Sequence, residues 1–169
     1  MAYLFAASST DNIDAGTSVP HGSTFTVWAR LLFSTGTNQM IASYRNTTIN
    51  FQWYMSGLGT VSAALTASGV PTFVNWLSGL TNGTEHTLAL TYNGAGMQLW
   101  ADTDASPKAT VLLSTTPDQD AGQRFLIGNY FRGLDYSYDG TMFEVGWWNS
   151  ALSGAQLAQL GAGGVNATA

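Results

Sequence analysis

The sequence predicts a single all-β domain in which antiparallel strands form a sandwich or a barrel, with one short helix near the C-terminus. Candidate strands rich in β-branched and aromatic residues recur about every 10–15 residues, with Gly, Asn, Asp and Pro between them. Only one segment of the chain has the apolar spacing of a helix. The 169 residues correspond to one domain that is long enough to bury a core of its own.

The strands of the N-terminal half begin with residues 24–33, "TFTVWARLLF". Apolar side chains alternate onto one face of this strand, which is typical of a half-buried strand. They are Phe25, Val27, Ala29, Leu31 and Phe33. Three further strands are predicted in this half, and an Asn-Thr-Thr turn separates the first two. They lie at 39–45, 49–55 and 60–67.

The C-terminal half opens on a predicted hairpin formed by 86–92 and 97–102. Leu88, Leu90 and Tyr92 share one face of its first strand, and the Asn-Gly step between the two strands is a strong hairpin signal. Three more apolar runs complete the predicted strands. They lie at 109–115, 124–130 and 140–148.

A short helix is predicted after the last strand. Ser153 and Gln156 have the spacing of a capping box, and Leu157 and Leu160 fall on one helical face. The sequence "GAGGVNATA" that follows has the composition of a flexible segment. The predicted division of the chain is therefore a domain, 1–160, and a flexible tail, 161–169.

Composition excludes several classes of protein. Charged residues make up only 9% of the chain and the net charge is −5, so no basic surface is expected that could neutralise nucleic-acid phosphates. The absence of cysteine rules out disulfides and thiolate chemistry. The N-terminus lacks the features of a signal peptide, and no apolar run reaches the roughly 18 residues of a membrane span. We expect neither nucleic-acid nor membrane partners.

Four stretches carry an ordered set of motifs. They are "FTVWARL" (25–31), "EHTLALTYNGAGMQLWAD" (85–102), "LIGNY" (126–130) and "YDGTMFEVGWWNSALSGAQLAQL" (138–160). In this order the chain resembles the laminin G-like, concanavalin A-like jelly rolls, although Glu85 replaces a usual Trp and Phe143 a usual Asp. The resemblance implies a jelly-roll sandwich of two antiparallel sheets with one short C-terminal helix. It does not specify function, because this fold carries lectins, glucanases, adhesion modules and virus structural proteins.

The residues do not support the enzymes of this fold. Glucanases with this fold resemble one another in a Glu-x-Asp-x-(x)-Glu strand, whose carboxylates lie about 5 Å apart in a retaining enzyme. The chain has two glutamates, Glu85 and Glu144, and they fall in different predicted strands with no second carboxylate expected beside either. His21 and His86 have no nucleophile near them in sequence, and we expect surface or hydrogen-bonded strand positions. Spacing leaves a serine triad open, but no G-x-S-x-G motif is present. We predict that the protein is not an enzyme.

The resemblance also implies calcium as an alternative, because concanavalin A-like modules often hold this ion at a rim through Asp, Asn and backbone oxygens. The candidate pairs are Asp102 with Asp104, Asp118 with Asp120, and Asp135 with Asp139. Paired aspartates are equally typical of turns, where the side chain bonds its own backbone. We predict no obligatory cofactor, and calcium at the first or the third pair stays open.

The chain is rich in aromatic residues that could stack on sugar rings. The candidates are Trp28, Trp53, Trp76, Trp100 and Trp148. Trp28 and Trp100 fall on the strand faces opposite the apolar ones, and Trp53 and Trp76 fall near or in predicted loops. The alternative is that these rings fill the core or an interface between subunits.

The last strand separates two neighbouring tryptophans. Strand alternation places Val145 and Trp147 on one face with Phe143, and Glu144 and Trp148 on the other. The two rings therefore cannot form one flat platform. One of them should enter the core, and the other should face solvent, the helix or a partner.

Three functions follow from these observations, and we rank them. The first is a non-enzymatic structural and interaction protein on the outside of a larger assembly, such as a virion decoration, fibre or tail protein that binds protein partners and forms homo-oligomers. The second is a carbohydrate-binding, lectin-like module, assisted by calcium in one version. The third is a glycoside hydrolase. The expected location is a virion surface or another extracellular assembly reached without a signal peptide, and otherwise the cytoplasm.

Overall fold

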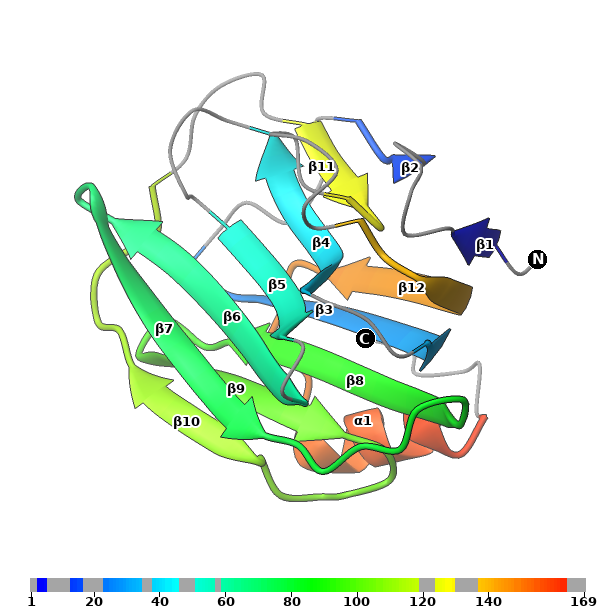
Figure 1. Cartoon of the computed structure of the whole chain (residues 1–169). Helices are drawn as coiled ribbons and strands as arrows, with labels where there is room; N and C mark the ends of the chain where they lie inside the picture. The colour runs from blue at the N-terminus through cyan, green and yellow to red at the C-terminus, as the bar shows by residue number, and fades with distance from the viewer. Residues whose placement is uncertain are drawn as a thin grey trace.

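The computed structural model describes residues 3–5, 13–16, 23–34, 38–45, 51–56, 59–118, 124–129 and 137–163. In these residues two antiparallel sheets of six strands each face one another, and α1 (Gly154–Gly161) packs on the outside of one of them (Figure 1). Sheet A has the strand order β1-β12-β3-β8-β9-β10, and sheet B has the order β2-β11-β4-β5-β6-β7. The predicted all-β sandwich with one short helix is confirmed.

The strands of sheet A are β1 (Tyr3–Phe5), β12 (Gly140–Trp148), β3 (Phe25–Phe33), β8 (Glu85–Tyr92), β9 (Gly96–Ala101) and β10 (Ala109–Leu112). The strands of sheet B are β2 (Ile13–Asp14), β11 (Arg124–Ile127), β4 (Gln39–Arg45), β5 (Phe51–Ser56), β6 (Thr60–Ala67) and β7 (Val70–Leu77). No helix in the described ranges has the length and hydropathy needed to cross a membrane.

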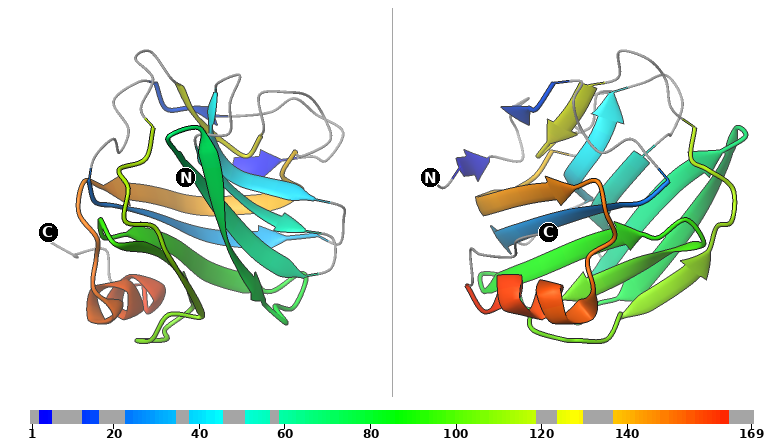
Figure 2. Two further views of the ribbon diagram at one scale, coloured as in Figure 1. Left: turned by 90° about the vertical axis from the view of Figure 1, so that its left-hand side faces the viewer. Right: turned by 180° about the vertical axis from the view of Figure 1, so that it is seen from behind.

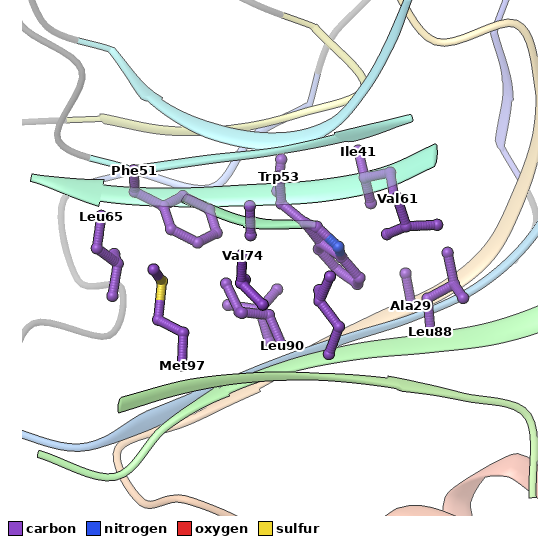
Figure 3. Close-up of a cluster of buried hydrophobic side chains, with 14 of the residues drawn as sticks. Ala29, Ile41, Phe51, Trp53, Val61, Leu65, Val74, Leu88, Leu90 and Met97 are labelled. Atoms are coloured by element: carbon purple, nitrogen blue, oxygen red, sulfur yellow. The ribbon is translucent and has the colours of Figure 1, made fainter. Parts of the chain in front are cut away.

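The core lies between the two sheets, because each strand turns its apolar face inward. Phe51 and Trp53 of sheet B point toward Leu90 and Met97 of sheet A (Figure 3). Trp53 has no exposed surface at all. Complete burial of a large apolar side chain contributes about 1.5–3 kcal/mol, so these rings account for much of the stability of the sandwich.

Three observed strands are absent from the predicted nine: the short β1 and β2, and the eight-residue β7, where Pro71 and the nearby glycines resemble a loop. Proline is tolerated here because β7 is the edge strand of sheet B, where an N–H that points away from the sheet is not needed. Of the two tryptophans expected near or in loops, Trp76 lies next to the end of β7 and Trp53 lies in the middle of β5. The nine predicted strands are all present, with ends shifted by no more than three residues.

The helix α1 covers the outer face of sheet A, on the side away from sheet B (Figure 2). The predicted capping box is confirmed, since the Ser153 N–H donates to Gln156 Oε1 at 2.9 Å and the Ser153 hydroxyl accepts from the Gln156 N–H. Two glycines allow the helix to approach the sheet closely. A Cβ at Gly154 would lie 2.2 Å from the carbonyl oxygen of Ala105, and one at Gly161 would lie 2.4 Å from that of Asp102.

Candidate ligand-binding site

The last strand, β12, organises the site through a bulge. Met142 lies opposite Leu31 of β3 and Glu144 lies opposite Arg30, so Phe143 has no partner in the ladder. The extra residue resets the alternation, and Val145 then lies opposite the inward-facing Ala29. Strand alternation predicts that Phe143 and Val145 share a face, and the bulge makes this prediction wrong. The Phe143 ring lies against the Arg30 guanidinium, with 5.2 Å between the ring centroid and Arg30 Cζ.

Beyond the bulge, the two tryptophans lie on opposite faces of sheet A, as alternation predicts. Trp147 is opposite the core residue Val27, and Trp148 is opposite Thr26, which faces the segment before α1. Thr26 is fully buried there, since its hydroxyl donates to Ser150 O at 2.8 Å and accepts from Leu152 N at 2.9 Å. The connection between β12 and α1 is thereby tied to the sheet.

Trp148 is half-buried beneath the helix. Its ring folds back over Gly146, where an added Cβ would lie only 2.7 Å from Trp148 Cη2. The ring packs against a cluster that joins the outer face of sheet A to α1. The cluster consists of Trp28, Ala89, Trp100, Leu152, Leu157 and Leu160. A hollow of about 230 Å³ remains beside Trp148 and Trp28, with Glu144 on its edge.

Trp147 lies on the other face of β12, and with 39% of its surface exposed it is the most exposed of the six tryptophans. Its ring centroid is 6.0 Å from that of Phe125 in sheet B. The ring borders a groove of about 480 Å³ where the edges of the two sheets separate. The groove is lined by Ile13, Ala15, Ile127, Met142, Phe143, Glu144, Val145 and Trp147.

A charged cluster adjoins this groove through Glu144, which lines it. Arg30 Nη1 is 3.2 Å from Glu85 Oε1, and Arg30 Nε is 3.5 Å from Glu144 Oε2. Arg30 Nε is buried and has no hydrogen-bond partner within the described residues. The two glutamates lie in different strands, as expected, and both reach the same guanidinium because β8 and β12 flank β3.

The five predicted stacking residues fall into two groups. Trp28, Trp53 and Trp100 are 5%, 0% and 8% exposed, so their rings offer no accessible face to a sugar and serve packing. Trp76 and Trp148 are half-buried. The ring of Trp76 packs on the core, and Lys108 Nζ lies 5.6 Å from its centroid. The exposed ring belongs to Trp147, which is not one of the five.

The aspartates proposed for calcium serve other contacts. Asp102 accepts from Thr87 N at 3.1 Å and contacts His86 Nδ1 at 3.3 Å, and Asp104 forms an ion pair with Lys108. Asp139 is half-buried and its backbone N–H donates to Gln39 Oε1, while Asp135 lies outside the described residues, as does Asp120. Within the described ranges, no three Asp, Glu or His side chains are placed to hold a metal ion.

Two further predicted residues are accounted for. The carboxylate of Asp118 accepts from the N–H groups of Ser68 and Gly69, at 2.7 and 2.8 Å, and so caps the turn between β6 and β7. His86 has the predicted hydrogen-bonded strand position, with Nε2 3.2 Å from Thr81 O. His21 lies outside the described residues.

Comparison with known families decides the classification. The Laminin_G_3 family model, described as the concanavalin A-like lectin/glucanases superfamily, matches residues 7–158. The chain belongs to this superfamily. A search of curated proteins found no match to the chain.

Several solved structures are similar to this member of the superfamily. A carbohydrate-binding module of the Ruminococcus gnavus IT-sialidase, bound to α2,3-sialyllactose, has a TM-score of 0.72 and 15% identity, with 95% of this chain and 97% of that chain covered. The heptameric SAP-like pentraxin of Limulus polyphemus has a TM-score of 0.71, 16% identity and coverages of 95% and 81%. The NanB sialidase of Streptococcus pneumoniae has a TM-score of 0.73 and 14% identity, and 94% of this chain covers 27% of that one. At such identities the likeness establishes the fold alone.

Proposed function

We propose that this domain binds a neutral carbohydrate in the groove beside Trp147 and catalyses no reaction. The observation that carries the proposal is the exposed Trp147 ring in a groove of about 480 Å³ with the Glu144 carboxylate at its rim. An indole face stacks on the apolar C–H face of a sugar, and a carboxylate accepts hydrogen bonds from its hydroxyls. The groove lies within the roughly 300–1,000 Å³ of typical ligand sites, whereas the hollow beside Trp148 is smaller.

Charge favours a neutral sugar over an acidic one. The charged side chain that lines the groove is Glu144, and the chain as a whole carries a net charge of −5. Arg30 already has a carboxylate on two sides, so no free guanidinium is left to pair with a carboxylate of the ligand. The Ruminococcus gnavus module is bound to a sialylated sugar, and we expect a different preference here.

The same cluster supports a binding role without catalysis. Glu85 and Glu144 are the two glutamates of the chain, and their side chains are 46% and 44% exposed against one guanidinium. Retaining and inverting glycosidases instead place two carboxyl groups on either side of the scissile bond, one of them in a setting that keeps it protonated. A panel of polysaccharides that released sugar when incubated with the protein would overturn this part of the proposal.

The test of binding is a glycan array followed by titration calorimetry, with neutral oligosaccharides and sialyllactose as probes. We expect neutral sugars to bind and Trp147→Ala to weaken them by about tenfold or more, which corresponds to about 1.4 kcal/mol. Gln159→Ala, an exposed change on α1, is the matched control and should leave affinity unchanged. Binding should persist in EDTA, since calcium is the alternative. Neutral sugars that fail to bind, or that bind Trp147→Ala equally well, contradict the proposal.

A second function is favoured by a separate observation. We propose that the domain is carried on the outside of a larger assembly, in its most concrete form as a virion decoration, fibre or tail protein. The exposed apolar residues Phe73 and Leu77 on the uncharged strand β7 support a contact with protein. Immunogold electron microscopy of particles from the source should label their surface, and label confined to the cytoplasm would exclude this location.

A further inference from the structure

One edge of β7 has no backbone partner in the part of the chain that the structure describes. Ser78 N donates to Gly59 O at 2.9 Å, and Leu77 lies opposite Thr60. Bonded and non-bonded positions alternate along an antiparallel ladder, so every second residue of β7 bonds to β6 and the residues between them point their backbone groups outward. The outward-pointing residues are Pro71, Phe73, Asn75 and Leu77.

The side chains at this edge are exposed and uncharged. Phe73 and Leu77 are 42% and 76% exposed, and Asn75 between them is exposed as well. The chain contains no charged residue from 59 to 83. The register of β7 with β6 is regular over eight residues, without a bulge. Proteins protect such edges with charges, bulges or covering segments. β7 itself carries Pro71 at one end, and β10 of sheet A approaches it.

We propose that two copies of the chain pair through their β7 strands, antiparallel about a twofold axis that passes beside Asn75. In this register, Phe73 of one copy lies opposite Leu77 of the other, and the two Asn75 residues face one another. The backbone N–H and C=O groups of Phe73, Asn75 and Leu77 all point outward. Each of these residues can therefore form a hydrogen-bonded pair with the residue opposite it in the second copy. Apolar side chains then meet apolar ones, and amide meets amide. The two copies of sheet B become one continuous sheet.

Charge and symmetry favour a second copy as the occupant of this edge. A twofold interface requires one patch that complements itself, and the register about Asn75 satisfies this condition. Two copies that each carry −5 repel one another, and a contact through the stretch 59–83 keeps like charges of that stretch out of the interface, because it holds no charged residue. A charged partner strand would find no opposite charge on β7. The pairing is independent of glycan binding, because β7 and the groove lie at opposite ends of the strand order.

A disulfide trap tests the register directly. The chain has no cysteine, so Asn75→Cys introduces a single thiol. Residues opposite one another in a bonded pair have Cα atoms about 5.5 Å apart, within the roughly 4.4–6.8 Å of a disulfide. We expect the oxidised Asn75→Cys protein to run as a covalent dimer. The matched control Gln159→Cys, also exposed but on α1, should stay monomeric on a non-reducing gel.

Analytical ultracentrifugation of the full chain tests the dimer itself. We expect twice the monomer mass for the wild type over a wide range of concentrations. Asn75→Lys places two like charges opposite one another and should raise the dissociation constant by about tenfold or more, whereas Gln159→Lys should leave it unchanged. Thermal unfolding of both variants verifies that they are folded. A monomeric wild type, a dimer that Asn75→Lys leaves intact, or a pairing of β7 with another protein would each overturn the proposal.

Discussion

Strands β12 and β7 both expose an aromatic ring, and the two rings differ in their surroundings. Trp147 of β12 lies in a groove with the Glu144 carboxylate at its rim. Phe73 of β7 lies on an open sheet edge in a strand without charge. A hollow with a hydrogen-bond acceptor suits a small polar ligand, and a flat edge with free backbone groups suits another strand. Exposure alone therefore does not assign a role to an aromatic residue, because the neighbouring charge and backbone decide it.

The two strands also differ in their support from the other elements. On the outer face of β12, Trp148 packs against the cluster that includes Leu157 and Leu160 of α1, and on its inner face Trp147 is backed by Phe125 of the opposite sheet. In β7, the side chain of Val74 is buried on the inner face, and the outer face of the strand is exposed. We expect substitutions beneath or within β12 to have larger effects than those beneath β7.

The largest expected effect concerns the core beneath each strand. Phe125→Ala removes a fully buried ring that packs on Phe51 and Tyr44 and backs Trp147. It should lower the free energy of unfolding by about 3–5 kcal/mol. Val74→Ala, on the inner face of β7, removes fewer buried atoms and should lower the free energy of unfolding by clearly less. Urea denaturation of both variants measures the difference, and equal losses would contradict the contrast between the two regions.

An intermediate effect is expected where Trp148 folds over Gly146. Gly146→Ala places a methyl group 2.7 Å from Trp148 Cη2, and overpacking of this kind costs about 1–3 kcal/mol. If the ring causes the clash, Gly146→Ala should cost little once Trp148→Ala has removed it. A double-mutant cycle in urea should therefore show a large coupling energy. Additive losses would mean that the glycine is required for another reason. Sedimentation of the β7 dimer should not change.

The smallest effect separates two glutamates that share one arginine. Glu144 borders the groove and Glu85 does not, although both contact Arg30 and are similarly exposed. Glu144→Gln should weaken neutral-sugar binding by about tenfold, because a charged acceptor is lost at the rim. Glu85→Gln is the matched control and should change affinity little. Titration calorimetry with the best neutral ligand measures both, and equal effects would place the ligand outside the groove.

Much of the fold could be predicted because alternation of apolar residues and turn chemistry are local. The strand that contains Phe25, Val27 and Ala29 and the capping box at Ser153 are found where their patterns indicate. β7 escaped prediction because Pro71 signals a loop unless the strand is known to lie at a sheet edge. Edge position depends on which strands pair, and pairing joins residues far apart in the chain.

The candidate site could be predicted only in part. Alternation places Trp147 and Trp148 on opposite faces, but it does not tell which ring α1 covers. The bulge at Phe143 and the approach of Glu85 and Glu144 to Arg30 depend on the order β12-β3-β8. Burial of Trp28 and Trp100 likewise depends on where the helix packs. Each of these features is a contact between strands, or between the helix and a strand, that lie far apart in the sequence.

By itself, the sequence determined the sandwich class, the helix and its cap, the absence of disulfides and the scarcity of charge, because these properties follow from composition and from neighbours along the chain. The tertiary structure decided which tryptophan remains exposed, which carboxylate borders the groove and which strand ends a sheet. The physical reason is that burial and exposed edges are set by packing between elements. The same residue type then fills the core at Trp53 and lines the proposed site at Trp147.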